Sequence, residues 1–450
     1  MRRISATLLI IALSCGAQAD NSTAAPVATP TAAATPPSAP LSLAQLIDRS
    51  LSANPDTRAA WQRSRSQVER VGIAKSAYYP TLDASASLSE RLGDAAVPGA
   101  ERQTQLGLNS QWLLWDFGGR RANLDSTQQT LAALQASQDT ASQQIAISAV
   151  QNWFAQLSAR ASLEAAQASL LAAEETAKAA RQRQLIGVAT REDELQAETA
   201  LAQARLTLIQ RQGELAASAG RLAVIAGYAA DTPLALDYQD NGLDSLRQEA
   251  SAQPPELKQL LTLAQERRPE LIAQQLRVQA NSSELDRIAA QARPRLSLSA
   301  SSNNSRDDLS QSQGGQVALT ATLPLFTGFQ QRHQEALAQS QIAEQGIELA
   351  RIQQQVSLDV WLAWQQFSTA QARITATDSL LAAASESSRA ALARYQAGLG
   401  NLLNVLTAQS NLADARQQHA RSRFDFAAAR LQLAQASGLL VRDTAMEFRQ

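Results

Sequence analysis

The chain has 450 residues, of which 40 are Lys or Arg and 41 are Asp or Glu, so its formal net charge is −1. A balance this close to zero excludes nucleic acid as a partner, because binding to a phosphate backbone needs a surplus of Lys and Arg. The chain has a single cysteine, which excludes a disulfide framework and a Cys-ligated metal, and no cofactor is expected.

The N-terminus has the pattern of a secretory signal peptide over residues 1–19. Two arginines precede an apolar run, and residues 17–19 (AQA) form a small-residue cleavage site. A second interpretation stays open, because residues 12–15 loosely resemble a bacterial lipobox in which Cys15 is acylated and becomes the first residue. No later segment approaches the roughly 18 uninterrupted apolar residues of a membrane-spanning helix. Any contact with a membrane core is therefore expected from strands.

Residues 20–40 are rich in Ala, Thr and Pro and have no hydrophobic period, which is typical of an extended linker. The rest of the chain contains an internal duplication, with matching residues at a shift of 214 early in each copy and of 211 from residue 114 onward. Matched pairs include Pro55 with Pro269, Trp153 with Trp364, Gly187 with Gly398, and Gly227 with Gly438. We therefore expect two structural repeats, 41–250 and 251–440, and a C-terminal tail over 441–450.

Each repeat is expected to contain the same elements in the same order. The apolar residues have a helical period first, then a period of two, and then a helical period again over a long proline-free stretch. At about 1.5 Å per residue, each long helix is roughly 100 Å long. The expected elements are helices within 42–79 and 256–293, β-hairpins at 81–115 and 295–325, long helices at 120–186 and 330–397, and return helices at 190–227 and 401–438.

The strands of the hairpins alternate between apolar and small polar residues, as Leu82 and Ala84 do with the Asp and Ser beside them. Strands of roughly ten residues with one apolar face have the length and the two faces of outer-membrane strands. An open sheet edge is not satisfied in lipid, and four strands are too few to close, so a trimer with about twelve strands is expected. The polar hairpin loops, 91–102 and 302–315, are expected to face the cell exterior.

Seven aromatic residues gather at the strand ends that adjoin the helices. Trp and Tyr are enriched where a membrane meets water, so this cluster is expected to form a membrane-interface belt in contact with outer-membrane lipid. Core packing at the junction between helices and strands is the alternative. The seven residues are Tyr78, Tyr79, Trp112, Trp115, Phe117, Phe326 and Phe329.

The order of the elements, their duplication and four local motifs together resemble the TolC family of outer-membrane efflux and secretion channels over about residues 42–440. The motifs are LWDFGGR at 114–120, PLFTG at 324–328, RYQAG at 394–398 and NVL at 404–406. The resemblance implies a fold that is mostly α with membrane β. Duplicated long helical hairpins would form an α-helical tunnel, and four strands per chain would contribute to a trimeric 12-stranded transmembrane barrel.

The resemblance also implies a function, namely a passive exit duct across the periplasm and the outer membrane. The duct would belong to a tripartite efflux pump or a type I secretion system. Its partners would be a periplasmic adaptor protein and an inner-membrane transporter that supplies the energy. A periplasmic coiled-coil scaffold without a barrel is the alternative function. An outer-membrane enzyme is not favoured, because no cluster of acid, base or nucleophile is apparent in the sequence.

The resemblance places the pore constriction at the tips of the helical hairpins, where the family has acidic rings and polar links. This sequence keeps Asp193 and Tyr395, which are expected to form a hydrogen-bonded latch. It departs at Asn404 and Thr407, where the family has aspartates, and at Gly400, where the family has a cation. These departures put the family's cation-binding acidic gate in doubt. The adaptor is expected to dock on the tips, at Gly187, Thr190, Gly398 and Asn401.

Overall fold

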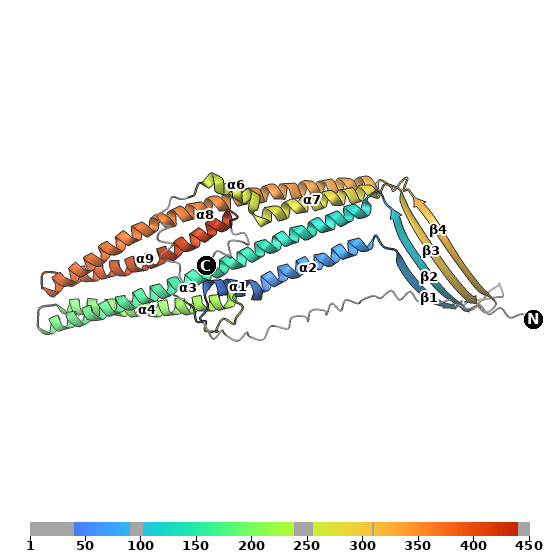
Figure 1. Cartoon of the computed structure of the whole chain (residues 1–450). Coiled ribbons are helices and arrows are strands. Elements are labelled where there is room, and N and C mark those ends of the chain that lie inside the picture. The colour runs from blue at the N-terminus through green and yellow to red at the C-terminus, as the bar shows by residue number, and fades with distance from the viewer. Residues whose placement is uncertain (1–39, 91–101, 238–254, 308–309, 440–450) are drawn as a thin grey trace, which may run out of the picture.

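The computed structural model of the chain describes residues 40–90, 102–237, 255–307 and 310–439. The expected signal peptide with Cys15, nearly all of the expected linker, the loop after the first strand and the expected tail lie outside these residues. The molecule is elongated, with a layer of helices that ends at one side in a β-sheet (Figure 1).

Two copies of one set of elements follow each other along the chain. The first copy contains α1 (Leu43–Ala53), α2 (Pro55–Ser76), β1 (Thr81–Glu90), β2 (Arg102–Trp115), α3 (Gly119–Leu185) and α4 (Arg191–Ile225). The second contains α6 (Leu257–Arg267), α7 (Pro269–Ala290), β3 (Arg295–Asp307), β4 (Gln311–Thr322), α8 (Gln330–Gln396) and α9 (Leu402–Ala436). The expected fold class, duplicated long helical hairpins with four strands, is confirmed.

Each of the two helical stretches that precede a hairpin is divided by a proline. Pro55 and Pro269 occupy the first positions of α2 and α7, where a missing N–H is harmless. The residue before each proline is extended, with Asn54 at φ −66° and ψ 131°, because the proline ring disfavours helical geometry there. The side chain of Asn54 also accepts a hydrogen bond from the Asp56 backbone N–H at 2.8 Å. The stretches are therefore two helices each, joined at a sharp boundary.

The four strands form one antiparallel sheet in the order β1-β2-β3-β4. The pairing of β2 with β3 joins the two repeats, with Trp112 opposite Leu298. The expected loop 302–315 is wrong, because β3 and β4 stay paired as far as Arg306 opposite Gln311. Backbone pairing does not depend on apolar side chains, so the polar residues there extend the hairpin instead of forming its loop. Among the described residues, both outer strands, β1 and β4, have one unpaired edge.

The helices form a layer in which α3 is the central member. On the side near the sheet, α3 packs between α2 and α7, and farther away it packs between α4 and α9, while α8 contacts α7 and then α9 (Figure 1). Two apolar clusters hold the middle of the layer. Trp153 of α3 packs with Leu46 of α1 in one cluster, and Val360 of α8 packs with Leu260 of α6 in the other. The short helices α1 and α6 are thus fixed at equivalent places in the two repeats.

Within the part of the chain that the structure describes, no helix combines the length and the apolar character needed to cross a membrane.

Candidate functional site at the hairpin tips

The far ends of the two helical hairpins are formed by matching turns. Each long helix ends at a glycine in the left-handed region, Gly187 with φ +79° and Gly398 with φ +75°. Beyond each glycine the chain bonds back to the last helical turn, from the Val188 N–H to the Arg183 carbonyl at 3.0 Å and from the Leu399 N–H to the Arg394 carbonyl at 2.9 Å. This is the glycine-based helix ending in which otherwise unsatisfied carbonyls gain donors.

The return helices begin with side-chain caps. The Thr190 hydroxyl accepts a bond from the Asp193 N–H at 3.1 Å, and the Asp193 carboxylate accepts one from the Thr190 N–H at 2.9 Å. This reciprocal pair satisfies two backbone donors at the start of α4. At the start of α9, the Asn401 side chain accepts a bond from the Asn404 N–H at 2.9 Å. The four residues expected to dock the adaptor therefore all lie at these turns, and the docking itself stays a prediction.

The two tips pack against each other through a small apolar cluster. Ala180 of α3 and Ala197 of α4 meet Tyr395 of α8 and Leu402 and Val405 of α9, and all five residues are buried. A further bond joins the hairpins, from the Gln409 side chain to the Thr176 hydroxyl at 2.9 Å. The tips thus form one packed unit within the protomer.

Arg183 holds the two tips together in a way that the sequence reasoning missed. Its guanidinium carbon lies 4.5 Å from the centre of the Tyr395 ring, and its Nη1 donates a hydrogen bond to the Tyr395 backbone carbonyl. One side chain of the first repeat therefore makes a cation–π contact and a charge-assisted bond to the second repeat. The duplication pairs Arg183 with Arg394 by position, but position alone gave it no role.

The expected latch between Asp193 and Tyr395 is not formed within the chain. The Asp193 carboxylate is engaged in the cap of α4. The Tyr395 hydroxyl oxygen is buried and has no hydrogen-bond partner among the described residues. Burial raises the pKa of the Tyr395 hydroxyl, because the charged phenolate is disfavoured away from water. The physical link between the hairpins is therefore Arg183, and the tyrosine contributes its ring and its carbonyl.

The remaining residues assigned to the constriction lie on the first turns of α9. Asn404 and Thr407 are both exposed, so their side chains are free to line a pore in an assembly. The opposite side of such a pore would be formed by other copies of the chain, so the role of Asn404 and Thr407 stays a prediction.

Glu194 is a second feature that the sequence reasoning missed. It is 3% exposed, although it lies in the charged first turn of α4. Its carboxylate contacts Arg191 and lies 3.7 Å from the Arg181 Nε. The buried carboxylate is thus paired with two guanidinium groups, as a buried charge requires. The spacing of three residues to buried Ala197 is the signal that could have identified this inward position.

The seven aromatic residues of the expected belt lie at the junction of sheet and helices, and all are between 37% and 76% exposed. This exposure argues against core packing within the chain. Phe117 and Phe329, at φ 51° and 65°, are the non-glycine residues with positive φ among those described. Such a backbone costs about 1–3 kcal/mol at each residue. Each ring also packs edge-on against an aromatic residue just before it, Trp115 or Phe326. Both repeats therefore keep a strained aromatic residue at this junction, and contact with lipid stays a prediction.

Arg120 fixes the junction in the first repeat. Its guanidinium donates to the carbonyls of Leu113 at 2.6 Å and Leu114 at 3.0 Å, and it lies over the Tyr78 ring at 4.8 Å. Its backbone N–H donates to the Asp116 carboxylate at 2.6 Å. The LWDFGGR motif is thus a strand-to-helix corner in which Arg120 satisfies the carbonyls at the strand end. Among the described residues no group of three or more His, Cys, Asp or Glu could hold a metal ion.

Comparison with protein families gives one match that spans both repeats. The family described as outer membrane efflux protein matches residues 46–228 and 260–439. Protein CyaE of Bordetella pertussis is 29% identical over 410 residues, which covers 90% of this chain and 85% of CyaE. The outer membrane efflux protein BepC of Brucella suis is 23% identical over 387 residues, which covers 84% of this chain and 81% of BepC.

Solved structures share the fold along most of the chain. The outer membrane protein VceC of Vibrio cholerae superposes with a TM-score of 0.74 at 23% identity, covering 88% of this chain and 96% of VceC. The open state of the MtrE outer membrane channel of Neisseria gonorrhoeae gives a TM-score of 0.76 at 21% identity, covering 88% of each chain. At this level of identity the likeness is one of fold.

Proposed function

The chain belongs to the outer membrane efflux protein family, and we propose that three copies of it form a passive exit duct across the periplasm and the outer membrane. As a family member it is an outer-membrane channel protein and not an enzyme, and its helical part lies in the periplasm. The family assignment replaces the alternative of a periplasmic scaffold.

The main observation that supports a trimeric assembly is that the sheet has two open edges. β1 and β4 are the outer strands, with 10 and 12 residues, which is close to the roughly 9–11 residues of a membrane-crossing strand. Each unpaired backbone group in lipid costs several kcal/mol. Pairing β4 of one copy with β1 of the next removes both edges. Three copies supply about twelve strands, above the eight of the smallest bacterial barrels.

The edges of the helical layer support the same assembly. Large apolar side chains that no neighbour covers lie on α8 at one edge and on α2 and α4 at the other. Single exposed apolar residues are ordinary, but rows of them on unpartnered helix edges are typical of an interface. Examples are Leu337 and Ile347 on α8, Ile73 on α2, and Leu206 and Ile209 on α4.

The direction of the duct follows from its length. Each long helix has 67 residues, which corresponds to about 100 Å. The hairpin tips are therefore the part of the chain able to extend far from the membrane, toward a periplasmic adaptor and an inner-membrane transporter. The duct needs no cofactor, because the transporter would supply the energy for either efflux or type I secretion. The β-hairpin loops at the other end would face the cell exterior.

The experiment is a mass measurement in detergent combined with conductance in planar bilayers. We expect a trimeric mass by light scattering and stable channels from the wild-type protein. Ile347→Asp, at an exposed position on edge helix α8, should weaken the trimer because it buries a charge in the interface. Leu171→Asp is the matched control, because Leu171 is 63% exposed but lies on the central helix α3. A monomeric wild-type mass would refute the assembly.

A further inference from the structure

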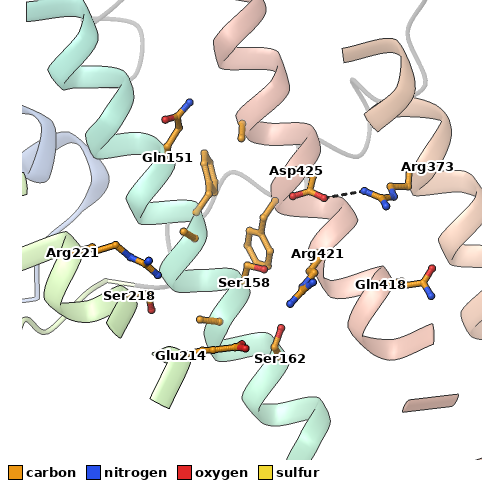
Figure 2. A pocket seen from close by; sticks show the side chains of 15 residues that line it. Gln151, Ser158, Ser162, Glu214, Ser218, Arg221, Arg373, Gln418, Arg421 and Asp425 are labelled. Atoms are coloured by element: carbon orange, nitrogen blue, oxygen red, sulfur yellow. Dashed lines mark hydrogen bonds and ion pairs between the residues drawn. The ribbon is translucent and has the colours of Figure 1, made fainter. Parts of the chain in front are cut away.

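Two cavities lie on one face of the helical layer. The first has a volume of about 550 Å³ and is lined by α3, α4 and α9, with Arg373 of α8 at its side. The second has a volume of about 460 Å³ and is lined by α8 and α9. Both volumes fall in the roughly 300–1,000 Å³ range of small-molecule sites. Figure 2 shows the first cavity, with lining side chains from α3, α4, α8 and α9.

The second cavity is the duplicate of the first. The residues of α3 and α4 that line the first cavity correspond, at a shift of 211 residues, to residues of α8 and α9 that line the second. Every residue of this part has its counterpart in the second cavity, which also includes Ala428, although several residue types differ. Pairs that differ in chemical type include Phe154 with Gln365, Ser162 with Arg373, Ser218 with Ala429, and Arg221 with Gln432. The repeats thus keep the cavity and change its chemistry.

Both cavities lie on the face opposite the short helices. Trp153 packs toward α1, whereas Ser158 and Ser162 line the cavity. At about 100° per residue these serines lie roughly 140° and 180° around α3 from Trp153. In the second repeat, Trp364 donates to the Pro255 carbonyl just before α6, and Arg373 is again nine positions later on the cavity side. If α1 and α6 lay on the inner face of a closed duct, they would narrow the passage, so we place them on its outer face. The cavities, on the opposite face of the helical layer, then face the inside of the duct.

The first cavity carries unpaired positive charge. Its two carboxylates already have partners, because Asp425 pairs with Arg373 at 3.3 Å and Glu214 pairs with Arg211 at 2.6 Å. Arg221 and Arg421 have no carboxylate within ion-pair distance among the described residues. They extend toward the cavity from opposite sides, from α4 and α9 (Figure 2). The duplicate cavity has Gln432 in place of Arg221 and does not include Arg421.

The wall of the first cavity also has an aromatic part. Phe154 of α3 and Phe424 of α9 both line the cavity, with ring centroids 6.4 Å apart, and small alanines complete the wall. Guanidinium groups bind carboxylates, sulfonates and phosphates through paired N–H donors, and aromatic rings bind flat apolar groups. We propose that the first cavity is a binding site for aromatic organic anions on the inner wall of the duct, and that its duplicate is not. The inward orientation rests on the proposed function, whereas the binding itself does not.

Binding can be measured on the full-length protein in detergent, with naphthalene disulfonate as the probe. We expect isothermal titration calorimetry to detect one site per chain. Arg221→Gln, which gives the first cavity the residue of its duplicate, and Arg421→Gln should each weaken binding roughly tenfold, as expected for the loss of one charge-assisted hydrogen bond. Arg389→Gln is the matched control, because Arg389 is an exposed arginine on α8 outside both cavities.

The outcomes separate this site from the channel function. Equal binding by wild type and by both cavity variants would overturn the proposal, and so would the absence of binding to wild type. Equally tight binding of a naphthalene carrying two ammonium groups would also overturn it. Light scattering and circular dichroism check that the variants are folded. Channels that conduct in bilayers but do not bind the probe would refute the site alone, whereas a failure to form channels would refute the proposed function.

Discussion

Removal of the Arg183 side chain should loosen the hairpin tips, whereas removal of the Tyr395 hydroxyl should not. Arg183 stacks on the Tyr395 ring and donates to its carbonyl. The Tyr395 hydroxyl is buried and has no hydrogen-bond partner in the part of the chain that the structure describes. The two substitutions therefore act at one contact with opposite expectations, Arg183→Ala removing bonds and Tyr395→Phe removing an unsatisfied group.

The magnitude follows from the contacts. A hydrogen bond from a charged group contributes about 1.5–3 kcal/mol, and a partly exposed cation–π contact contributes about 0.5–1 kcal/mol. Because the Arg183 side chain is only partly buried, we expect Arg183→Ala to lower the free energy of opening the tips by an amount near the lower end of the summed ranges. This is about 2 kcal/mol, or roughly a thirtyfold change in the opening equilibrium. Tyr395→Phe should change it by less than about 0.5 kcal/mol, in either direction.

Hydrogen exchange of the tip segments, residues 183–197 and 394–406, measures this local opening in the assembled protein. Arg183→Ala should raise the exchange rate of amides such as Leu399, whose N–H is bonded at the turn. Arg389→Ala is the control, because its pair with Glu386 is highly exposed and such pairs contribute about 0–1 kcal/mol. If Tyr395→Phe accelerates exchange as much as Arg183→Ala does, the hydroxyl has a partner and the reasoning is refuted.

Three further predictions concern the same tips. Asn404→Asp should add one negative charge per chain to the constriction and increase cation selectivity; an unchanged reversal potential in planar bilayers would show that residue 404 does not line the pore. Gly187→Ala should destabilise the first turn by about 1–2 kcal/mol, because φ is +79° there. Gly213→Ala, in open space within α4, should instead stabilise that helix by about 0.5–1 kcal/mol. Hydrogen exchange distinguishes the two variants, and equal effects would contradict the turn geometry. Burial raises the pKa of the Tyr395 hydroxyl, so an opened tip loses that proton at a lower pH than a closed one, and tip stability should fall as pH rises above about 10. The tyrosinate absorbance of wild type minus that of Tyr395→Phe should therefore titrate at a higher pH than an ordinary tyrosine. A midpoint at an ordinary tyrosine pKa would contradict the prediction.

The sequence by itself determined the elements and their duplication, because these depend on local signals. The period of the apolar residues changes from helix to strand and back within each repeat, and the glycines and capping residues of the tips mark where helices end. Polarity was a poor signal for the loop of the second β-hairpin. Backbone pairing continued through the serines and glutamines there, since ladder bonds do not require apolar side chains.

Tertiary structure alone decided which residues meet across the two repeats. The pairing of β2 with β3, the contact of Arg183 with Tyr395 and the sharing of the first cavity between α3, α4, α8 and α9 all join segments far apart in the chain. No local period encodes them, because α3 changes its neighbours from α2 and α7 to α4 and α9 along its length. One side of such a helix is buried at one level and exposed at another. The role of each side chain therefore depends on the element that packs against it at that level, which only the folded chain specifies.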